Sequence, residues 1–375
     1  MSGIYIHIPF CKQACHYCNF HFSTSLNNRD SIIKSMLREI EVKSAQCNDV
    51  IETIYFGGGT PSLLEIKEID NFIQLIIDKY KTSSNLEITL EANPDDLKLS
   101  KLKEIASTMI NRLSIGVQSF DDRELKMMNR SHKSEDSKKC IDNATLFFEN
   151  ISIDLIYGMP ESNVKSWDNN LNLFLDWNLN HVSAYALTVE PNTALENYIK
   201  KELIIPLDEE IVLEQFNLMN DKLKEFNYIN YELSSFAKDG YFSKNNTAYW
   251  LGKKFIGIGP SAHSFDGTSR SWNISNNALY INDISKNKMF HQKEKLTLKD
   301  QYNEYVMTGL RTMWGISLEY IEEKFGQKFK LHFLKKSKKF VDSDLIVFDE
   351  SHFKTTQKGK FLSDGIASEL FLINL

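Results

Sequence analysis

The stretch I-Y-I-H-I-P-F-C-K-Q-A-C-H-Y-C, residues 4–18, joins an apolar segment directly to a short loop that holds three cysteines. Ile4–Ile8 is rich in β-branched residues, which is typical of a buried strand. The loop spaces Cys11, Cys15 and Cys18 as C-x3-C-x2-C. Three thiols at this spacing can ligate three irons of a [4Fe–4S] cluster and leave the fourth iron open. A small molecule bound at that iron can exchange electrons with the cluster, so the stretch predicts both a strand and a redox centre.

The cysteines have two other possible uses, a zinc site and a disulfide framework. A zinc site needs four ligands, and His16 or His21 could complete one. A disulfide framework is disfavoured because five cysteines in 375 residues are too few and no secretory signal peptide is recognised. Cys47 and Cys140 stand alone in helix-like stretches and are expected to be small packed residues.

Composition restricts the class of protein. Hydrophobic residues make up 42% of the chain and charged residues 25%, so a well-filled globular core is expected. A net charge of −6 argues against a nucleic-acid binder that depends on phosphate contacts. No run of about 18 apolar residues occurs, so no transmembrane span is expected. The first strand begins almost at Met1, and we expect a cytoplasmic protein.

Apolar segments alternate with helix-like stretches along the first half of the chain. The predicted strands are Ile4–Ile8, Ile51–Phe56, Leu86–Glu91, Arg112–Val117, Ile151–Tyr157 and His181–Ala186. The helix-like stretches between them include Asp30–Ser44, Leu63–Tyr80, Leu99–Met109 and Ser134–Glu149. This order predicts right-handed βαβ units and a parallel sheet, that is, an α/β fold with a partial (β/α)6 barrel of the TIM-like kind.

Unusual residues follow the end of each predicted strand, where barrel enzymes build their sites. The second strand leads to Gly57-Gly58-Gly59-Thr60, whose backbone could approach a ligand closely, although a tight turn is the simpler interpretation. Glu91 ends the third strand and could accept a hydrogen bond from a ligand amine or ribose hydroxyl, or lie in solvent. Taken singly, Gln118, Arg130 and Asp154 are as readily surface or capping residues.

The cysteine spacing resembles that of the radical SAM superfamily. Other segments resemble its coproporphyrinogen dehydrogenase-like branch, and within it the heme chaperones, over nearly the whole chain. These segments are Y-F-G-G-G-T-P-S (55–62), L-E-A-N-P-D-D-L (90–97), L-S-I-G-V-Q-S-F (113–120), I-D-L-I-Y-G-M-P (153–160), Y-A-L-T-V-E-P-N-T-A-L (185–195), Y-E-L-S-S-F-A (231–237), N-N-T-A-Y-W (245–250) and I-G-I-G-P-S-A-H-S-F (256–265).

The resemblance implies roles for individual residues. Cys11, Cys15 and Cys18 would hold the cluster. Ten residues would contact S-adenosylmethionine, and some could belong to a second such molecule: Tyr5, Tyr17, Gly58, Gly59, Thr60, Glu91, Gln118, Arg130, Asp154 and Ala186. The resemblance further implies heme as a ligand, heme-accepting apo-proteins such as respiratory enzymes as partners, and an electron donor. Contact with a membrane surface is compatible with it.

Two features favour the chaperone over the related oxygen-independent coproporphyrinogen III oxidase. The oxidases that this chain resembles carry the pattern C-x3-C-x2-C-x-C, with a fourth cysteine two residues after the third. In this chain Phe20 stands at the position of that fourth cysteine. The oxidases also carry a longer segment before the cluster. The chaperones that this chain resembles carry the motif H-N-x-x-Y-W. In this chain Asn245 replaces the histidine of that motif, and its amide is a poor heme ligand. Tyr249 and Trp250 could stack on a porphyrin, and His263 is an alternative iron ligand, or a buried structural histidine.

The C-terminal part differs from the barrel region. An amphipathic stretch at Asp300–Met313 and a helix at Leu318–Phe325 precede a hairpin at 344–356 and a final helix at Lys358–Ile373. This order predicts a small winged-helix-like α+β domain. We expect three regions: the barrel at 1–235, a family-specific region with the N-N-T-A-Y-W element at 236–295, and the C-terminal domain at 296–375. The acidic balance favours docking over nucleic-acid binding for the last.

Overall fold

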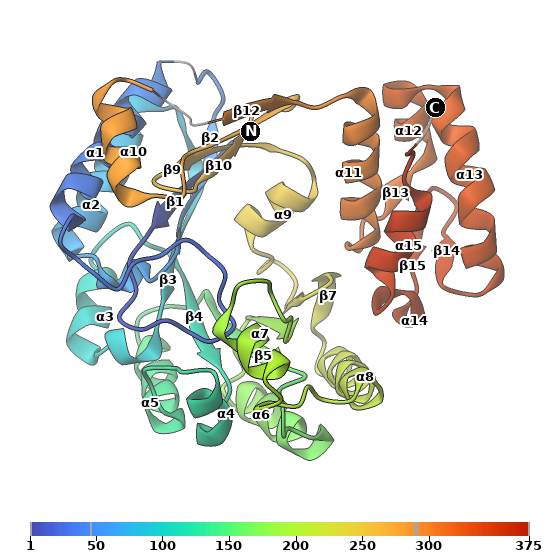
Figure 1. Cartoon of the computed structure of the whole chain (residues 1–375), viewed down its shortest axis with the longest axis horizontal. Helices are drawn as coiled ribbons and strands as arrows, with labels where there is room; N and C mark the ends of the chain where they lie inside the picture. The colour runs from blue at the N-terminus through green and yellow to red at the C-terminus, as the bar shows by residue number, and fades with distance from the viewer. Residues whose placement is uncertain (1, 46, 289–291, 374–375) are drawn as a thin grey trace.

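The computed structural model describes residues 2–45, 47–288 and 292–373, and its centre is one mixed β-sheet (Figure 1). The strand order is β12-β11-β10-β9-β1-β2-β3-β4-β5-β6-β8-β7. The six predicted strands form its parallel middle, with the bounds β1 Ser2–Ile8, β2 Ile51–Gly58, β3 Thr82–Ala92, β4 Arg112–Gln118, β5 Ile151–Tyr157 and β6 His181–Ala186. Because β12 and β7 are separate edges, the described sheet stays open. The prediction of a partial (β/α)6 barrel is confirmed.

The helices that connect these strands cover the outer face of the sheet. They are α1 Arg29–Ser44, α2 Ile66–Lys79, α3 Leu99–Ile105, α4 Asp122–Met127, α5 Ser134–Ala144 and α6 Val164–Asp176, with 3-10 turns at Pro61–Leu63 and Pro94–Asp96. In α2 the buried residues recur every three or four positions, at Ile69, Phe72, Ile73 and Ile76. The predicted helix at Ser134–Glu149 ends earlier, since the chain turns after Ala144 and returns Phe148 to the core.

Parallel pairing brings the C-terminal ends of the central strands to one rim. Ile8 of β1 lies opposite Gly58 of β2, and Phe56 of β2 lies opposite Leu90 of β3. Alternate side chains of each strand point away from the outer helices into the barrel interior. The loops that leave this rim therefore surround one space, as barrel geometry requires.

Residues beyond β6 extend the sheet at both edges. These elements are α7 Ala194–Lys200, α8 Glu209–Glu225, β7 Ile229–Glu232, β8 Ser235–Ala237, α9 Lys244–Trp250, β9 Lys254–Ile258, β10 His263–Phe265, β11 Ser269–Trp272, α10 Asn277–Ser285 and β12 Gln292–Lys295. β9 pairs in parallel with β1, whereas β8 pairs antiparallel with β6. The N-terminal strand thus lies inside the sheet; the boundaries at residues 235 and 295 stay predictions.

The C-terminal part forms a separate α+β unit with its own hydrophobic core. Its elements are α11 Leu298–Leu310, β13 Ile316–Ser317, α12 Leu318–Phe325, α13 Gln327–Asp342, β14 Ile346–Phe348, β15 His352–Thr355, α14 Gln357–Lys360 and α15 Ser363–Leu370. The predicted hairpin is confirmed as β14 and β15, with β13 as a third strand. The single helix expected at Lys358–Ile373 is wrong, because the chain turns at Phe361, whose ring packs on Phe216 of α8.

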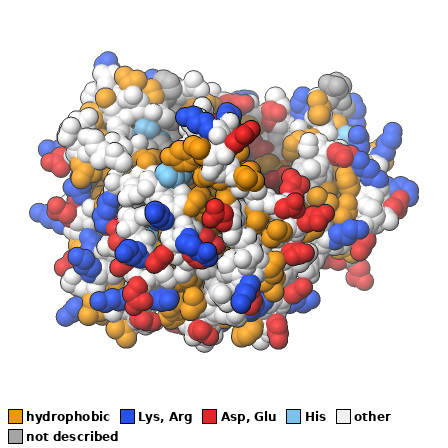
Figure 2. All heavy atoms as spheres, turned by 60° about the horizontal axis from the view of Figure 1, so that its bottom comes forward, with side chains coloured by type: hydrophobic (Ala, Val, Ile, Leu, Met, Phe, Trp, Pro, Cys, Tyr) orange, Lys and Arg blue, Asp and Glu red, His pale blue; other side chains and the backbone are white. Residues whose placement is uncertain are grey.

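Helix α9 lies between the sheet and α11 (Figure 1). The two units also meet where Arg270 of β11 forms an ion pair with Glu304 of α11 at 3.0 Å. On the face shown in Figure 2, positive and negative side chains are interspersed, in keeping with the mixed composition. No helix in the described ranges is both long and apolar enough to cross a membrane.

Candidate cluster and cofactor pocket

A cavity of about 470 Å³ opens at the C-terminal rim of the barrel, a size typical of small-molecule sites. Its lining comes from the cysteine loop that follows β1 and from the C-terminal ends of β2 to β6. It includes twelve of the thirteen residues predicted for the cluster and S-adenosylmethionine: Cys11, Cys15, Tyr17, Cys18, Gly58, Gly59, Thr60, Glu91, Gln118, Arg130, Asp154 and Ala186. Tyr5 lies beneath the cavity instead of lining it.

Backbone contacts hold the cysteine loop against three distant segments. The amide of Cys11 donates to the carbonyl of Ser23 at 3.1 Å, which anchors the start of the loop. The amide of His16 donates to the carbonyl of Met128, and the carbonyl of His16 accepts from the amide of Leu195 at 2.8 Å. These contacts present the three sulfurs to one cavity, although the loop itself contains no regular helix or strand.

Hydrogen-bond donors point at two of the sulfurs. The Thr60 hydroxyl donates to Sγ of Cys11 at 3.4 Å, and Nη1 of Arg130 donates to Sγ of Cys15 at 3.3 Å. Asn93 links the two donors, since it accepts from Nη2 of Arg130 at 2.7 Å and donates to Oγ1 of Thr60 at 3.4 Å. Donors of this kind stabilise thiolates that ligate iron. The residues present therefore fit a [4Fe–4S] cluster.

The cysteines are free thiols, and burial affects their ionisation. Burial raises the pKa of Cys11 to about 11 and raises that of Cys18 as well. Iron must therefore displace protons that these thiols hold at neutral pH. In the described chain, no three His, Cys, Asp or Glu side chains are arranged to hold one metal ion.

The glycine run that follows β2 passes close to other backbone. Gly58 adopts φ +106°, and a Cβ there would meet the ring of His7 at 2.6 Å. A Cβ on Gly59 would meet the carbonyl oxygen of Phe10 at 2.6 Å. Neither position admits a side chain without movement, so the run is more than an ordinary tight turn.

Two carboxyl groups line the cavity, Glu91 of β3 and Asp154 of β5. Glu91 accepts a hydrogen bond from the Tyr55 hydroxyl at 2.8 Å. Burial raises the pKa of Glu91 to about 7 and that of Asp154 to about 6, while the cation of Arg112 partly opposes the shift at Asp154. At neutral pH these carboxyl groups can hold or release a proton, and as carboxylates they would attract a cationic ligand.

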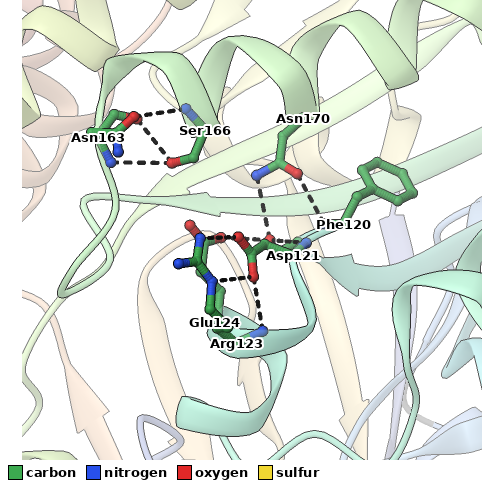
Figure 3. A network of polar contacts seen from close by, with 8 residues as sticks. Phe120, Asp121, Arg123, Glu124, Asn163, Ser166 and Asn170 are labelled. Atoms are coloured by element: carbon green, nitrogen blue, oxygen red, sulfur yellow. Dashed lines mark hydrogen bonds and ion pairs between the residues drawn. The ribbon is translucent and has the colours of Figure 1, made fainter.

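Gln118 ends β4 with φ 67°, a left-handed conformation that is costly for a residue with a side chain. The next turn is held by the polar network in Figure 3. Asn170 of α6 accepts from the amide of Phe120 at 2.9 Å, and Ser119 donates to Glu124 at 2.5 Å. This network stabilises the turn that places Gln118 at the cavity and leads through α4 to Arg130.

Tyr5 supports the pocket from below together with His7, a residue that the sequence reasoning did not select. Nε2 of His7 lies 2.8 Å from the carbonyl oxygen of His21 and must donate to it, so Nδ1 accepts from the Tyr5 hydroxyl at 3.3 Å. Burial lowers the pKa of His7 to about 4, which keeps the ring neutral. The signal in the sequence was the I-Y-I-H-I alternation, which puts Tyr5 and His7 on one face of the strand.

Asn93 is the other residue missed, although it stands in the quoted L-E-A-N-P segment. Its role as a link between Arg130 and Thr60 depends on three separate strands meeting at the rim. No local pattern could have indicated it.

The four heme candidates are divided between α9, which carries Asn245, Tyr249 and Trp250, and β10, which carries His263. Asn245 is buried, accepts from the Thr53 hydroxyl at 3.2 Å and lies toward the N-terminal end of β2, away from the cysteines. Tyr249 packs on Phe255 of β9 with ring centroids 4.4 Å apart, and Trp250 lies against the guanidinium of Arg311. His263 is exposed, so the expectation of a buried structural histidine is wrong.

Comparison with known proteins agrees with this geometry. Residues 5–174 match the family model of the radical SAM superfamily, and residues 296–362 match that of the HemN C-terminal domain. The chain is 33% identical to "Heme chaperone HemW" of Bacillus subtilis over 98% of each chain. It is 30% identical to the Lactococcus lactis protein of the same name, over 99% of this chain and 97% of that one.

The solved structure of Escherichia coli coproporphyrinogen III oxidase (HemN), a radical SAM enzyme, superposes with a TM-score of 0.85 at 22% identity. The match covers 98% of this chain and 89% of that one. At this identity the likeness concerns the fold alone. Together with the curated relatives, these findings show that the chain belongs to the HemW- and HemN-like family of the radical SAM superfamily.

Proposed function

We propose that this protein is a heme chaperone: it binds a [4Fe–4S] cluster, S-adenosylmethionine and heme, and transfers heme to acceptor apo-proteins. The proposal includes action in the cytoplasm, respiratory enzymes among the acceptors, a separate electron donor and contact with a membrane surface. The full-length similarity to proteins named heme chaperones supports it.

One observation carries the choice between chaperone and oxidase. Phe20 lines the mouth of the cysteine pocket and is 67% exposed. It stands at the position of the fourth cysteine in the oxidase pattern. A phenyl ring there supplies no thiol, and its exposure means that it is not needed for the core. An exposed aromatic ring at a pocket mouth suits contact with a ligand or partner.

The residues of the pocket would divide the work of holding the cofactors. Cys11, Cys15 and Cys18 would ligate three irons, with Thr60 and Arg130 donating to two of the sulfurs. A bound cluster supplies one-electron chemistry to a molecule on its open iron.

Other residues would orient S-adenosylmethionine. The close-packed backbone at Gly58 and Gly59 would lie against its methionine part, and Glu91 and Asp154 would accept from its amine or ribose hydroxyls. Asn19 donates to Glu190 at 2.9 Å, and this contact ties the cysteine loop to the loop that follows β6. Such an arrangement serves ligand binding whether or not turnover occurs.

The alternative is oxygen-independent oxidation of coproporphyrinogen III to protoporphyrinogen IX. The complete cofactor pocket favours it, because that pocket has what generation of a 5′-deoxyadenosyl radical would require. Phe20 counts against it.

Anaerobic assays of the reconstituted protein separate the two functions. With dithionite, S-adenosylmethionine and coproporphyrinogen III, we expect no protoporphyrin product by chromatography, while a parallel titration shows heme binding at micromolar protein. Porphyrin turnover would establish the oxidase instead. Absence of heme binding, with the cluster intact and with it removed, would refute the chaperone.

A further inference from the structure

The histidines differ in how their rings are used. Seven of the described histidines have a ring nitrogen within hydrogen-bonding distance of a protein group. His263, by contrast, is exposed, and no hydrogen bond to its ring is present in the described residues. A neutral imidazole with free nitrogens is able to ligate a metal.

The imidazole is nevertheless held in one orientation. His263 of β10 pairs with Trp272 of β11, and their rings stack at 5.7 Å with an interplanar angle of 20°. The backbone of His263 also crosses directly over Gly257 of β9, where a Cβ would lie 2.0 Å from the His263 carbonyl oxygen. An exposed side chain that is fixed in this way loses little entropy when it binds a ligand.

The hairpin that carries His263 is anchored at both ends by one buried carboxylate. Glu39 of α1, which is fully buried, accepts from the amide of Gly259 at 2.8 Å and from the side chain of Asn273 at 2.8 Å. Asn273 in turn donates to the carbonyl of Gly259 at 2.7 Å. Gly259 precedes His263 and Asn273 follows Trp272, so Glu39 fixes the hairpin to the barrel wall.

Strand register places aromatic and basic groups on the same face as His263. Phe265 lies two residues further along β10 and pairs with both Phe255 of β9 and Arg270 of β11. Tyr249 of α9 packs on Phe255, which joins the N-N-T-A-Y-W element to this face. The opposite face of β9 is the core side, where Ile258 is buried. The face thus combines an imidazole, apolar rings and one guanidinium.

We propose that this face, rather than the region of Asn245, binds heme, with the imidazole of His263 as the iron ligand. The inference rests on the proposed function. Trp272 is a positioning residue that holds the imidazole plane, while Phe265, Phe255 and Tyr249 contact the apolar edge of the macrocycle. Arg270, whose side chain is 45% exposed, exchanges its ion pair with Glu304 for one with a propionate. Coordination forms an iron–nitrogen bond from the imidazole lone pair and needs no oxidant or reductant.

The test is a ferric heme titration of the full-length reconstituted protein, followed by absorbance and by electron paramagnetic resonance of the iron. Wild type, His263→Ala and His352→Ala are compared; the ring of His352 contacts its neighbour Ser351 in the C-terminal unit. We expect His263→Ala to weaken heme binding by at least about tenfold. Even substitution of a residue that only hydrogen-bonds to a metal ligand typically weakens metal binding by this much. We also expect a changed ligand signature, restored by added imidazole, while His352→Ala matches wild type.

A second comparison tests the role of Arg270. Arg270→Gln is expected to weaken heme binding about tenfold to a hundredfold, as loss of one charge-assisted hydrogen bond would. It should leave the axial-ligand spectrum unchanged and have no effect on binding of the heme dimethyl ester. Iron and sulfide content and S-adenosylmethionine binding establish that each variant is folded.

The outcomes separate the site from the function. If wild type binds heme and His263→Ala binds it equally well with the same spectrum, the site is wrong and the chaperone proposal stands. If wild type binds no heme, both are overturned. Loss of binding in His263→Ala with an intact cluster and rescue by imidazole supports both.

Discussion

Nη1 of Arg130 donates a hydrogen bond to Sγ of Cys15 across 3.3 Å, although the two residues are 115 positions apart in the chain. The same guanidinium donates to Oδ1 of Asn93 and, at 2.8 Å, to the carbonyl of Gly116. One side chain therefore ties the cysteine loop to the ends of β3 and β4.

Replacement of Arg130 should affect both folding and cluster retention. Lysine cannot reproduce the planar fork, so Arg130→Lys leaves Asn93 or Gly116 without its donor. We expect a loss of about 1–3 kcal/mol in the free energy of unfolding and less iron bound per chain. Arg123→Lys is the matched control, since its side chain is 83% exposed. Equal iron content and stability in Arg130→Lys and wild type would contradict this role.

Cys15→Ser tests the cluster ligands. We expect the variant to lose the broad absorbance at about 400 nm that iron–sulfur charge transfer produces, together with most of its iron. Cys47→Ser, at a half-buried cysteine outside the pocket, should keep both. Full colour and iron in Cys15→Ser would mean that this ligand is wrongly assigned.

The raised pKa of Glu91, about 7, predicts a pH dependence of stability. Between the ordinary pKa near 4.5 and this value, the folded protein holds a proton that the unfolded chain releases. Stability of the ligand-free protein therefore falls as pH rises through this range. Glu91→Gln removes the part of that dependence that Glu91 contributes, and at pH 8 it should be roughly 1–2 kcal/mol more stable than wild type. Denaturant unfolding at pH 5 and pH 8 measures the difference, and parallel curves for both proteins would disprove it.

The same residue predicts a pH dependence of binding. As a carboxylate, Glu91 attracts the cationic S-adenosylmethionine, so the affinity of wild type should rise with pH through about 7 and then level off. Calorimetry with Glu91→Gln should give weaker binding and a shallower profile, which keeps the contribution of Asp154 at about pH 6. A flat profile for wild type would remove Glu91 from the binding site.

Glu39 supports the hairpin that carries His263 and also pairs with Lys43 at 2.7 Å. Glu39 also accepts from the Tyr280 hydroxyl at 2.7 Å, which is its fourth partner. Removing this fully buried carboxylate should cost about 3–5 kcal/mol, so Glu39→Ala is expected to unfold at markedly lower denaturant. Glu41→Ala, on the same helix with a half-exposed side chain, should change stability by no more than about 0.5 kcal/mol. A small effect in Glu39→Ala would show that the hairpin is held by other contacts.

Much of the barrel and of the cofactor pocket could be predicted without the structure. A buried parallel strand needs a short β-branched run, and each run from Ile4–Ile8 to His181–Ala186 is local in the chain. Because parallel strands share one rim, the residues that follow them had to converge, which is why twelve predicted residues line one cavity. The cysteines lie within eight residues, so their proximity needed no tertiary contact.

The tertiary structure decided how these residues are supported and which histidine is available. His7 becomes neutral only because other segments bury it, and Asn93 joins Arg130 to Thr60 only where three strands meet. Asn245 is buried, and His263 is exposed although its sequence neighbourhood allowed a buried structural histidine. The local pattern of apolar residues determines strands and helices, because side chains point to alternate faces along a strand and turn steadily around the axis of a helix. Burial, ionisation and hydrogen bonding depend on contacts between distant segments, and only the folded chain creates these.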